Sequence, residues 1–128
     1  MTHPRPKRSY QTAEWRGRLA EIYILVFFLF QGYWPLYRRY QTTLGEIDLI
    51  LRRGHHLAFI EVKYRRRWQV SSFPLSPRSH QRFYRASALF LAHHPRYQGC
   101  HIQMMLAIVT GWGRIKMWRD CGPLSVSE

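Results

Sequence analysis

Two apolar segments joined by a short turn constrain this chain more than any other feature. Glu46–Leu51 and Leu57–Tyr64 are rich in Ile, Leu, Val and Phe, which favour β-strands. Gly54-His55, between them, has the composition of a two-residue hairpin turn with glycine first. Such a turn fixes the register of the two strands, because the residues that flank the turn then face each other. The sequence therefore predicts an antiparallel hairpin in which Asp48 faces Glu61.

This hairpin places charged groups among apolar neighbours. Facing residues of an antiparallel pair have Cβ atoms about 4.5–5.5 Å apart, so the Asp48 and Glu61 carboxylates would repel each other. Because side chains alternate along a strand, Lys63 shares the face of Glu61, whereas Val62 points to the other face. The residues alone leave two interpretations open. Either a hard cation such as Mg²⁺ lies between the carboxylates, or each carboxylate pairs with an arginine on a solvated face.

Hydrophobic spacing predicts the other elements. Ala13–Gln31 lacks proline and is followed by Gly32, which predicts a helix that ends there. A second helix is predicted over Pro77–His94, where apolar residues recur at helical spacing. Further strands are predicted at Tyr33–Gln41, His101–Val109 and Arg114–Trp118. The order α-β-β-β-α-β-β favours one α/β domain, a mixed sheet flanked by helices.

The length of 128 residues suits a single domain. We expect residues 1–12, which are basic and rich in proline, to form a flexible arm, residues 13–120 the domain, and residues 121–128 a tail. The apolar run Ile22–Phe30 is far shorter than the ~20 residues that span a bilayer, and no A-x-A-like cleavage site follows it. Cys100 and Cys121 have no metal-ligand spacing. We therefore expect no transmembrane segment and a cytoplasmic location.

The charge balance predicts a polyanionic partner. The chain has 20 Lys and Arg against 7 Asp and Glu, a formal net charge of +13, which favours nucleic acid, DNA or RNA. Ribosomal RNA or an anionic membrane surface is a further alternative, and such charges also occur on faces that simply contact solvent. The candidate nucleic-acid contacts are Arg38, Arg39, Arg52, Arg53, Arg65, Arg66 and Arg67.

The hairpin segments also resemble a known family. Gly45-Glu46-Ile47-Asp48-Leu49-Ile50, followed by Phe59-Ile60-Glu61-Val62-Lys63-Tyr64-Arg65, is similar to the paired signature of the YraN-like bacterial family (uncharacterised protein family 0102). Ala20-Glu21 and Arg82-Phe83-Tyr84-Arg85-Ala86 extend the resemblance to roughly residues 14–119. That family is similar in fold to PD-(D/E)xK nucleases and archaeal Holliday-junction resolvases.

The resemblance implies a restriction-endonuclease-like fold and metal-dependent hydrolysis of phosphodiester bonds in DNA or RNA, including structured or branched substrates. Glu21, Asp48, Glu61 and Lys63 match the catalytic positions. Asp48, Glu61 and the Val62 carbonyl would hold Mg²⁺ or Mn²⁺, and Lys63 would position the attacking water.

Two departures from the family pattern accompany this resemblance. Ser79 stands where the family usually has lysine, and Gln103-Met104-Met105 stands where it usually has Arg-Phe-Asp. The alternative function is a nucleic-acid-binding module of the same fold without turnover. A homodimer stays open beside a monomer.

Overall fold

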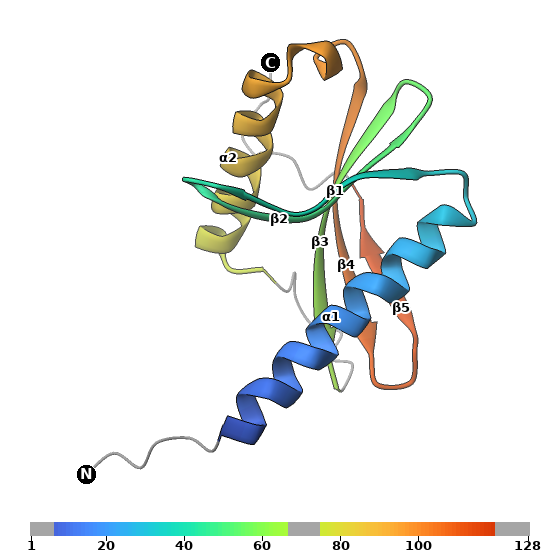
Figure 1. Cartoon of the computed structure of the whole chain (residues 1–128), viewed down its shortest axis with the longest axis vertical. Coiled ribbons are helices and arrows are strands. Elements are labelled where there is room, and N and C mark those ends of the chain that lie inside the picture. The colour runs from blue at the N-terminus through green and yellow to red at the C-terminus, as the bar shows by residue number, and fades with distance from the viewer. Residues whose placement is uncertain (1–6, 67–74, 120–128) are drawn as a thin grey trace.

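The computed structural model describes residues 7–66 and 75–119. It has the predicted order α-β-β-β-α-β-β, with one 3₁₀ turn added after the second helix (Figure 1). The α/β fold class, a mixed sheet flanked by helices, is confirmed. The elements are α1 (Lys7–Leu29), β1 (Trp34–Thr42), β2 (Gly45–Arg53), β3 (His56–Arg65), α2 (Pro77–His93), η1 (Pro95–Tyr97), β4 (His101–Thr110) and β5 (Ile115–Trp118).

The predicted start of the first helix is wrong. α1 begins at Lys7 rather than at Ala13, so residues 7–12 of the expected arm are helical. Proline disrupts the interior of a helix because it lacks a backbone N–H. The last proline of the expected arm is Pro6, which precedes α1, so no proline prevents residues 7–12 from being helical. Residues 1–6 of the arm and the tail at 121–128 lie outside the described residues.

The sheet has the strand order β1-β2-β3-β4-β5. β3 and β4 run parallel, and every other neighbouring pair is antiparallel. The hairpin register is the predicted one, because Arg53 faces His56 and Leu49 faces Ile60. Gly54 has a φ of 60°, which suits the first position of a two-residue turn.

The two long helices cover opposite faces of the sheet, each over a separate apolar cluster (Figure 1). The α1-side cluster comprises Ala20, Ile24, Phe28, Tyr33, Leu49, Leu51, Ala58, Ile60, Val62, Met105, Ala107 and Val109. The α2-side cluster comprises Ile47, Ile50, Leu57, Phe59, Leu75, Phe83, Ala86, Phe90, Tyr97, Met104, Leu106 and Ile108. β3 is thus buried on both faces along most of its length.

Within the described residues, neither long helix has the length and apolar character to cross a membrane.

The alternation of side chains in β2 breaks at Asp48. Ile47 belongs to the α2-side cluster and Leu49 to the α1-side cluster, although residues two apart on a regular strand share a face. The paired residues of β2 and β3 also end at Leu49 and Ile60. A break in the ladder frees backbone groups for side-chain partners, and the candidate site lies at this break.

Candidate functional site

A cavity of about 230 Å³ opens between the hairpin and the first turns of α2. Three of the residues that the sequence singled out, Asp48, Glu61 and Lys63, line it together. The full lining is Gly45, Glu46, Asp48, Glu61, Lys63, Ser79, Arg82 and Phe83.

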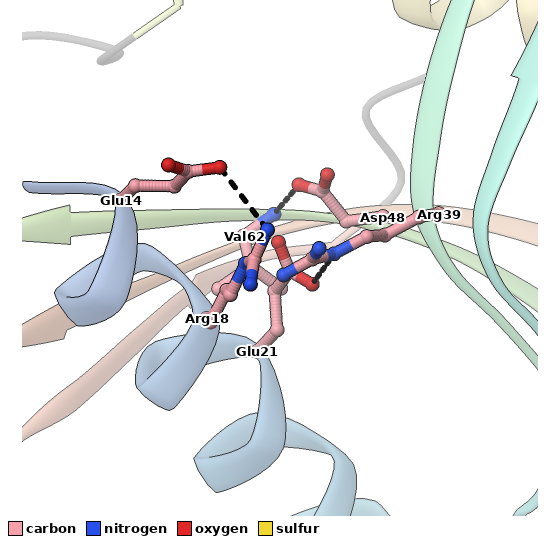
Figure 2. A network of polar contacts seen from close by, with 6 residues as sticks. All are labelled: Glu14, Arg18, Glu21, Arg39, Asp48 and Val62. Atoms are coloured by element: carbon pink, nitrogen blue, oxygen red, sulfur yellow. Dashed lines mark hydrogen bonds and ion pairs between the residues drawn. The ribbon is translucent and has the colours of Figure 1, made fainter. Parts of the chain in front are cut away.

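The Asp48 side chain bridges β2 and β3 where the ladder ends. Its Oδ2 accepts a hydrogen bond from the Val62 backbone N–H at 2.8 Å (Figure 2). The Val62 side chain packs in the α1-side cluster, on the face away from Glu61, as alternation predicted. The hydrogen bond fixes the carboxylate beside β3 and next to the position of Glu61.

Both carboxylates resist ionisation. Burial, and then the nearby charge of Glu61, raises the pKa of Asp48 to about 8, although the Val62 N–H acts in the opposite direction. Burial also raises the pKa of Glu61, against the opposing effect of Lys63. A positive charge near both side chains would therefore stabilise the ionised forms of these two buried carboxylic acids.

Lys63 supplies part of that charge. Its Nζ lies 3.4 Å from Glu61 Oε1, so the two side chains share a face as predicted. The Glu61 side chain is 17% exposed and that of Lys63 is 34% exposed. The ammonium therefore reaches solvent at the cavity while it contacts the buried carboxylate.

Glu21 lies outside the cavity lining and has another partner. Its Oε1 accepts a hydrogen bond from Arg39 Nε at 3.0 Å (Figure 2). Arg39 has a φ of 53°, a left-handed conformation that few residues other than glycine adopt. The Glu21 hydrogen bond raises the pKa of Arg39, and the charges of Glu46 and Asp48 add to this. Arg39 thus extends from β1 toward the acidic cluster rather than outward, unlike a simple nucleic-acid contact.

Arg52 and Arg53 lie at the opposite end of the hairpin from the cavity. The Arg52 guanidinium lies over the Tyr97 ring, 5.5 Å from its centroid, and that of Arg53 lies over the Tyr33 ring at 4.6 Å. Arg53 also donates a hydrogen bond to the Gln31 carbonyl. These guanidinium groups have local packing partners at that end of the molecule.

The remaining candidate arginines are dispersed. Arg38 is exposed on the edge strand β1. Arg65 and Arg66 are exposed just after Lys63, at the cavity end of β3, and Arg67 lies outside the described residues. The structure therefore does not gather the six described candidate arginines on one surface, and of these six only Arg65 and Arg66 follow directly from Lys63 on the cavity strand.

Three lining residues were not among the predicted catalytic, metal-binding or nucleic-acid-binding residues: Glu46, Ser79 and Arg82. Ser76 caps α2 by accepting the Ser79 backbone N–H at 3.1 Å, which fixes where the helix starts beside the hairpin. Only the packing of α2 against β2 brings Ser79 and Arg82 to Asp48, and no local pattern encodes that contact. The sequence gives one indication of a role for Glu46, because it is one of the few acidic residues near the hairpin.

The donor set fits a hard divalent cation. Asp48 and Glu61 offer oxygen ligands, and a cation would oppose the burial and the Glu61 charge that raise the Asp48 pKa. Among the described residues, no group of three or more His, Cys, Asp and Glu side chains is placed to hold a metal ion. The protein would thus supply two carboxylates and leave the other positions to water and substrate, an arrangement typical of Mg²⁺.

Comparison with known proteins identifies the family. The model of the family described as "Uncharacterised protein family UPF0102" matches residues 20–109. This chain belongs to the UPF0102 family. The match includes Glu21 and every residue of the cavity lining, so the site lies within the part of the chain that defines UPF0102.

UPF0102 relatives match over most of their length. A UPF0102 protein of Paramagnetospirillum magneticum is 34% identical over 116 residues, which cover 88% of this chain and 90% of that protein. One from Methylorubrum populi is 38% identical over 91 residues, 71% of this chain and 73% of the relative. One from Maricaulis maris is 36% identical over 102 residues, 80% of each chain.

Proposed function

We propose that this UPF0102 protein is a metal-dependent phosphodiesterase that cleaves DNA or RNA. The observation that carries the proposal is the meeting of Asp48, Glu61 and Lys63 in one open cavity, where the pKa of Asp48 is raised to about 8. Buried like charges destabilise a fold and are retained where they serve a function. The formal net charge of +13 supports a polyanionic substrate.

Each cavity residue has a role in this proposal. Asp48 and Glu61 would hold Mg²⁺ or Mn²⁺, which when bound acts as a Lewis acid on a phosphoryl oxygen and lowers the pKa of bound water. The Lys63 ammonium donates hydrogen bonds at the mouth of the cavity, where it orients a water molecule and stabilises negative charge on phosphate. The Val62 N–H holds the Asp48 carboxylate in its orientation.

Arg82 adds a phosphate contact from the second helix. Its side chain lines the cavity from α2, whereas the carboxylates come from β2 and β3. A guanidinium binds phosphate oxygens in a bidentate manner, which positions a substrate as well as attracting it. Arg82 thus replaces part of the positive charge that is lost where Ser79 stands instead of lysine.

The second candidate is a nucleic-acid-binding module without turnover. Two observations favour it: Glu21 is held by Arg39 outside the cavity lining, and Ser79 lacks the ammonium usual at its position. This module would bind nucleic acid through the same basic surface but would need no divalent cation. Dependence of cleavage on Mg²⁺ or Mn²⁺ therefore separates the two functions.

Single-turnover cleavage of labelled DNA and RNA, linear and branched, with Mg²⁺ or Mn²⁺ tests the proposal. We expect Lys63→Ala to lower the cleavage rate by about 10²–10³-fold, while gel shifts of the same samples change little, because the lost contact acts mainly in the transition state. The matched control is Lys116→Ala on β5, outside the cavity lining, which should cleave at the normal rate.

Two outcomes would change the conclusion. If the unmutated protein shifts nucleic acid but cleaves neither DNA nor RNA with either metal, the binding module is the correct function. If Lys63→Ala cleaves as fast as the unmutated protein, the active site lies elsewhere in the molecule.

A further inference from the structure

The outward face of α1 exposes an unusual amount of apolar surface. Trp15 is 63% exposed and Phe30, just after the helix, is 90% exposed. Five further side chains are each 38–46% exposed: Leu19, Ile22, Tyr23, Val26 and Leu29. Soluble monomers expose single apolar side chains often but contiguous patches of this size rarely.

This outer face lies opposite the side of α1 that packs on the sheet. Ala20, Ile24 and Phe28 recur every four residues and are buried in the α1-side cluster. At 100° per residue, the outer face is centred on the other side of the helix. α1 is therefore apolar on two opposite sides, a pattern typical of a helix that is buried on both.

The spacing on the outer face identifies what covers it. Trp15, Leu19, Ile22 and Val26 follow one another by four, three and four residues, the spacing of a coiled-coil seam. This spacing is the same when read from either end. We propose that α1 pairs antiparallel with α1 of a second copy of this chain. In that pairing Leu19 meets the partner's Ile22, and Trp15 meets the partner's Val26.

Side-chain size favours the antiparallel direction. A parallel pair would place the large Trp15 ring on the partner's Trp15. In the antiparallel pair this ring faces the smaller side chain of the partner's Val26, so large and small side chains alternate along the seam and fill space evenly.

The apolar surface is of the size that a small dimer interface needs. The exposed parts of Trp15 and Phe30 alone amount to roughly 300 Å², and the other five side chains contribute a similar area. The total, on the order of 600 Å² per copy, matches the lower range of specific interfaces. The outer face is therefore large enough to hold two copies together.

The arrangement leaves the candidate site accessible in both copies. The cavity lies on the face of the sheet that α2 covers, since Phe83 of its lining belongs to the α2-side cluster. α1 lies on the other face (Figure 1). A dimer formed through α1 would therefore expose two cavities, one on each outer side.

Sedimentation of the full-length protein over a series of concentrations tests this inference. We expect a dimer for the unmutated chain, and a dissociation constant at least about 100-fold higher for Leu19→Glu/Val26→Glu, because the interface would bury two charges from each copy. The matched control is Leu44→Glu, at a side chain of 43% exposure in the β1–β2 turn, which should dimerise normally. Rising salt should strengthen the dimer, because it screens repulsion between two basic chains.

A spin label gives a second measurement that leaves the outer face intact. The label is attached to Gln31→Cys in a chain with Cys100→Ser and Cys121→Ser. An antiparallel pair separates the two labels by about 30 Å along the helices, whereas a parallel pair brings them to about the interaxial distance of 8–10 Å. Labels at the short distance would overturn the antiparallel arrangement.

A purely monomeric protein at every concentration would overturn the dimer. Binding of the monomer to phosphatidylserine vesicles, if it is lost in Leu19→Glu/Val26→Glu, would also overturn the dimer, since the outer face would then contact a membrane surface. Circular dichroism of the double variant checks that it is folded, and the spin-label result decides the question if it is not.

Discussion

At the scale of single residues, Asp48 shows the conflict between folding and the proposed function. Its carboxylate is held by the Val62 N–H, yet burial and the charge of Glu61 oppose its ionisation. Without a cation the folded protein is stabilised by keeping a proton on this group. When a cation is bound, the folded protein is instead stabilised by loss of that proton, because only the ionised carboxylate is a good metal ligand.

Asp48→Asn should therefore stabilise the metal-free protein or leave it unchanged, and weaken divalent-cation binding. Asparagine keeps an oxygen that accepts the Val62 N–H but carries no charge. Above pH 8, where Asp48 is ionised in the folded protein, it therefore relieves repulsion worth up to about 1 kcal/mol across a strand pair. Thermal melts with EDTA and with Mg²⁺ measure the effect. Mg²⁺ should reverse the order, because a ligand stabilises only the form that binds it.

Asp48→Ala serves as the matched comparison for that measurement. It removes the same charge but leaves the Val62 N–H without its side-chain acceptor, which costs about 1–3 kcal/mol for a buried donor. An Asp48→Asn variant that is clearly less stable than the unmutated protein in EDTA would contradict the carboxylate repulsion described above.

The stability of the metal-free protein should fall as pH rises from about 4 to about 8. The pKa of Asp48 is about 8 in the folded protein against an ordinary 3.8, so in this range the folded chain binds a proton that the unfolded chain has lost. The contribution is complete below the lower value and lost above the higher one, at up to about 1.4 kcal/mol per pH unit. Urea denaturation in EDTA at several pH values measures the slope, and Asp48→Asn should flatten it. Equal slopes for the two proteins would show that Asp48 titrates normally.

The sequence predicted the residues of the site better than their contacts. Asp48, Glu61 and Lys63 could be placed together because a two-residue turn and side-chain alternation fix their positions. The partner of Glu21 could not be predicted. It depends on the left-handed Arg39 in β1, a conformation that no local propensity of arginine suggests. Arg82 reaches the cavity only through helix packing.

At the scale of elements, the hairpin was predicted from its turn and α1 was only partly predicted. Gly54 and His55 determine the pairing of β2 with β3 by local geometry. β1 has a register shift between Pro35 and Tyr37, since proline cannot donate to the ladder and lies on the edge strand. The basic composition of residues 7–12 is typical of a flexible arm, but these residues contain no proline and continue α1 toward its N-terminus.

Two glycine-to-alanine changes should have opposite effects on stability. Gly54 has a positive φ in the turn, where a Cβ costs about 1–2 kcal/mol, so Gly54→Ala should lower the free energy of unfolding. Gly17 lies within α1, and an added Cβ there meets no atom within 4 Å. Gly17→Ala should raise the free energy of unfolding by about 0.5–1 kcal/mol, because alanine favours the helix. Urea denaturation of both variants measures this, and a stabilising Gly54→Ala would contradict the turn that sets the hairpin register.

At the scale of the whole molecule, the basic charge is distributed unevenly with respect to the site. Arg52 and Arg53 stack on tyrosines at one end of the hairpin. Arg65 and Arg66 are exposed after Lys63 at the other end, beyond the cavity strand. If nucleic acid approaches the cavity, the second pair lies on its path and the first pair does not.

Binding of duplex DNA should weaken with salt, survive removal of divalent cations, and depend on the arginines beside the cavity. Each phosphate that a protein neutralises adds about 0.9 to the slope of log affinity against log salt. Arg65→Ala/Arg66→Ala should therefore lower the slope by up to about two, because both guanidinium groups are exposed and extend the cavity strand. Arg52→Ala/Arg53→Ala removes the same charge from the other end of the hairpin and should leave the slope nearly unchanged.

Fluorescence anisotropy of a labelled duplex in EDTA, over a range of salt concentrations, gives all three slopes. Equal losses in the two double variants would mean that net charge alone determines binding, whereas a larger loss for Arg52→Ala/Arg53→Ala would place the nucleic acid at the end of the molecule away from the cavity.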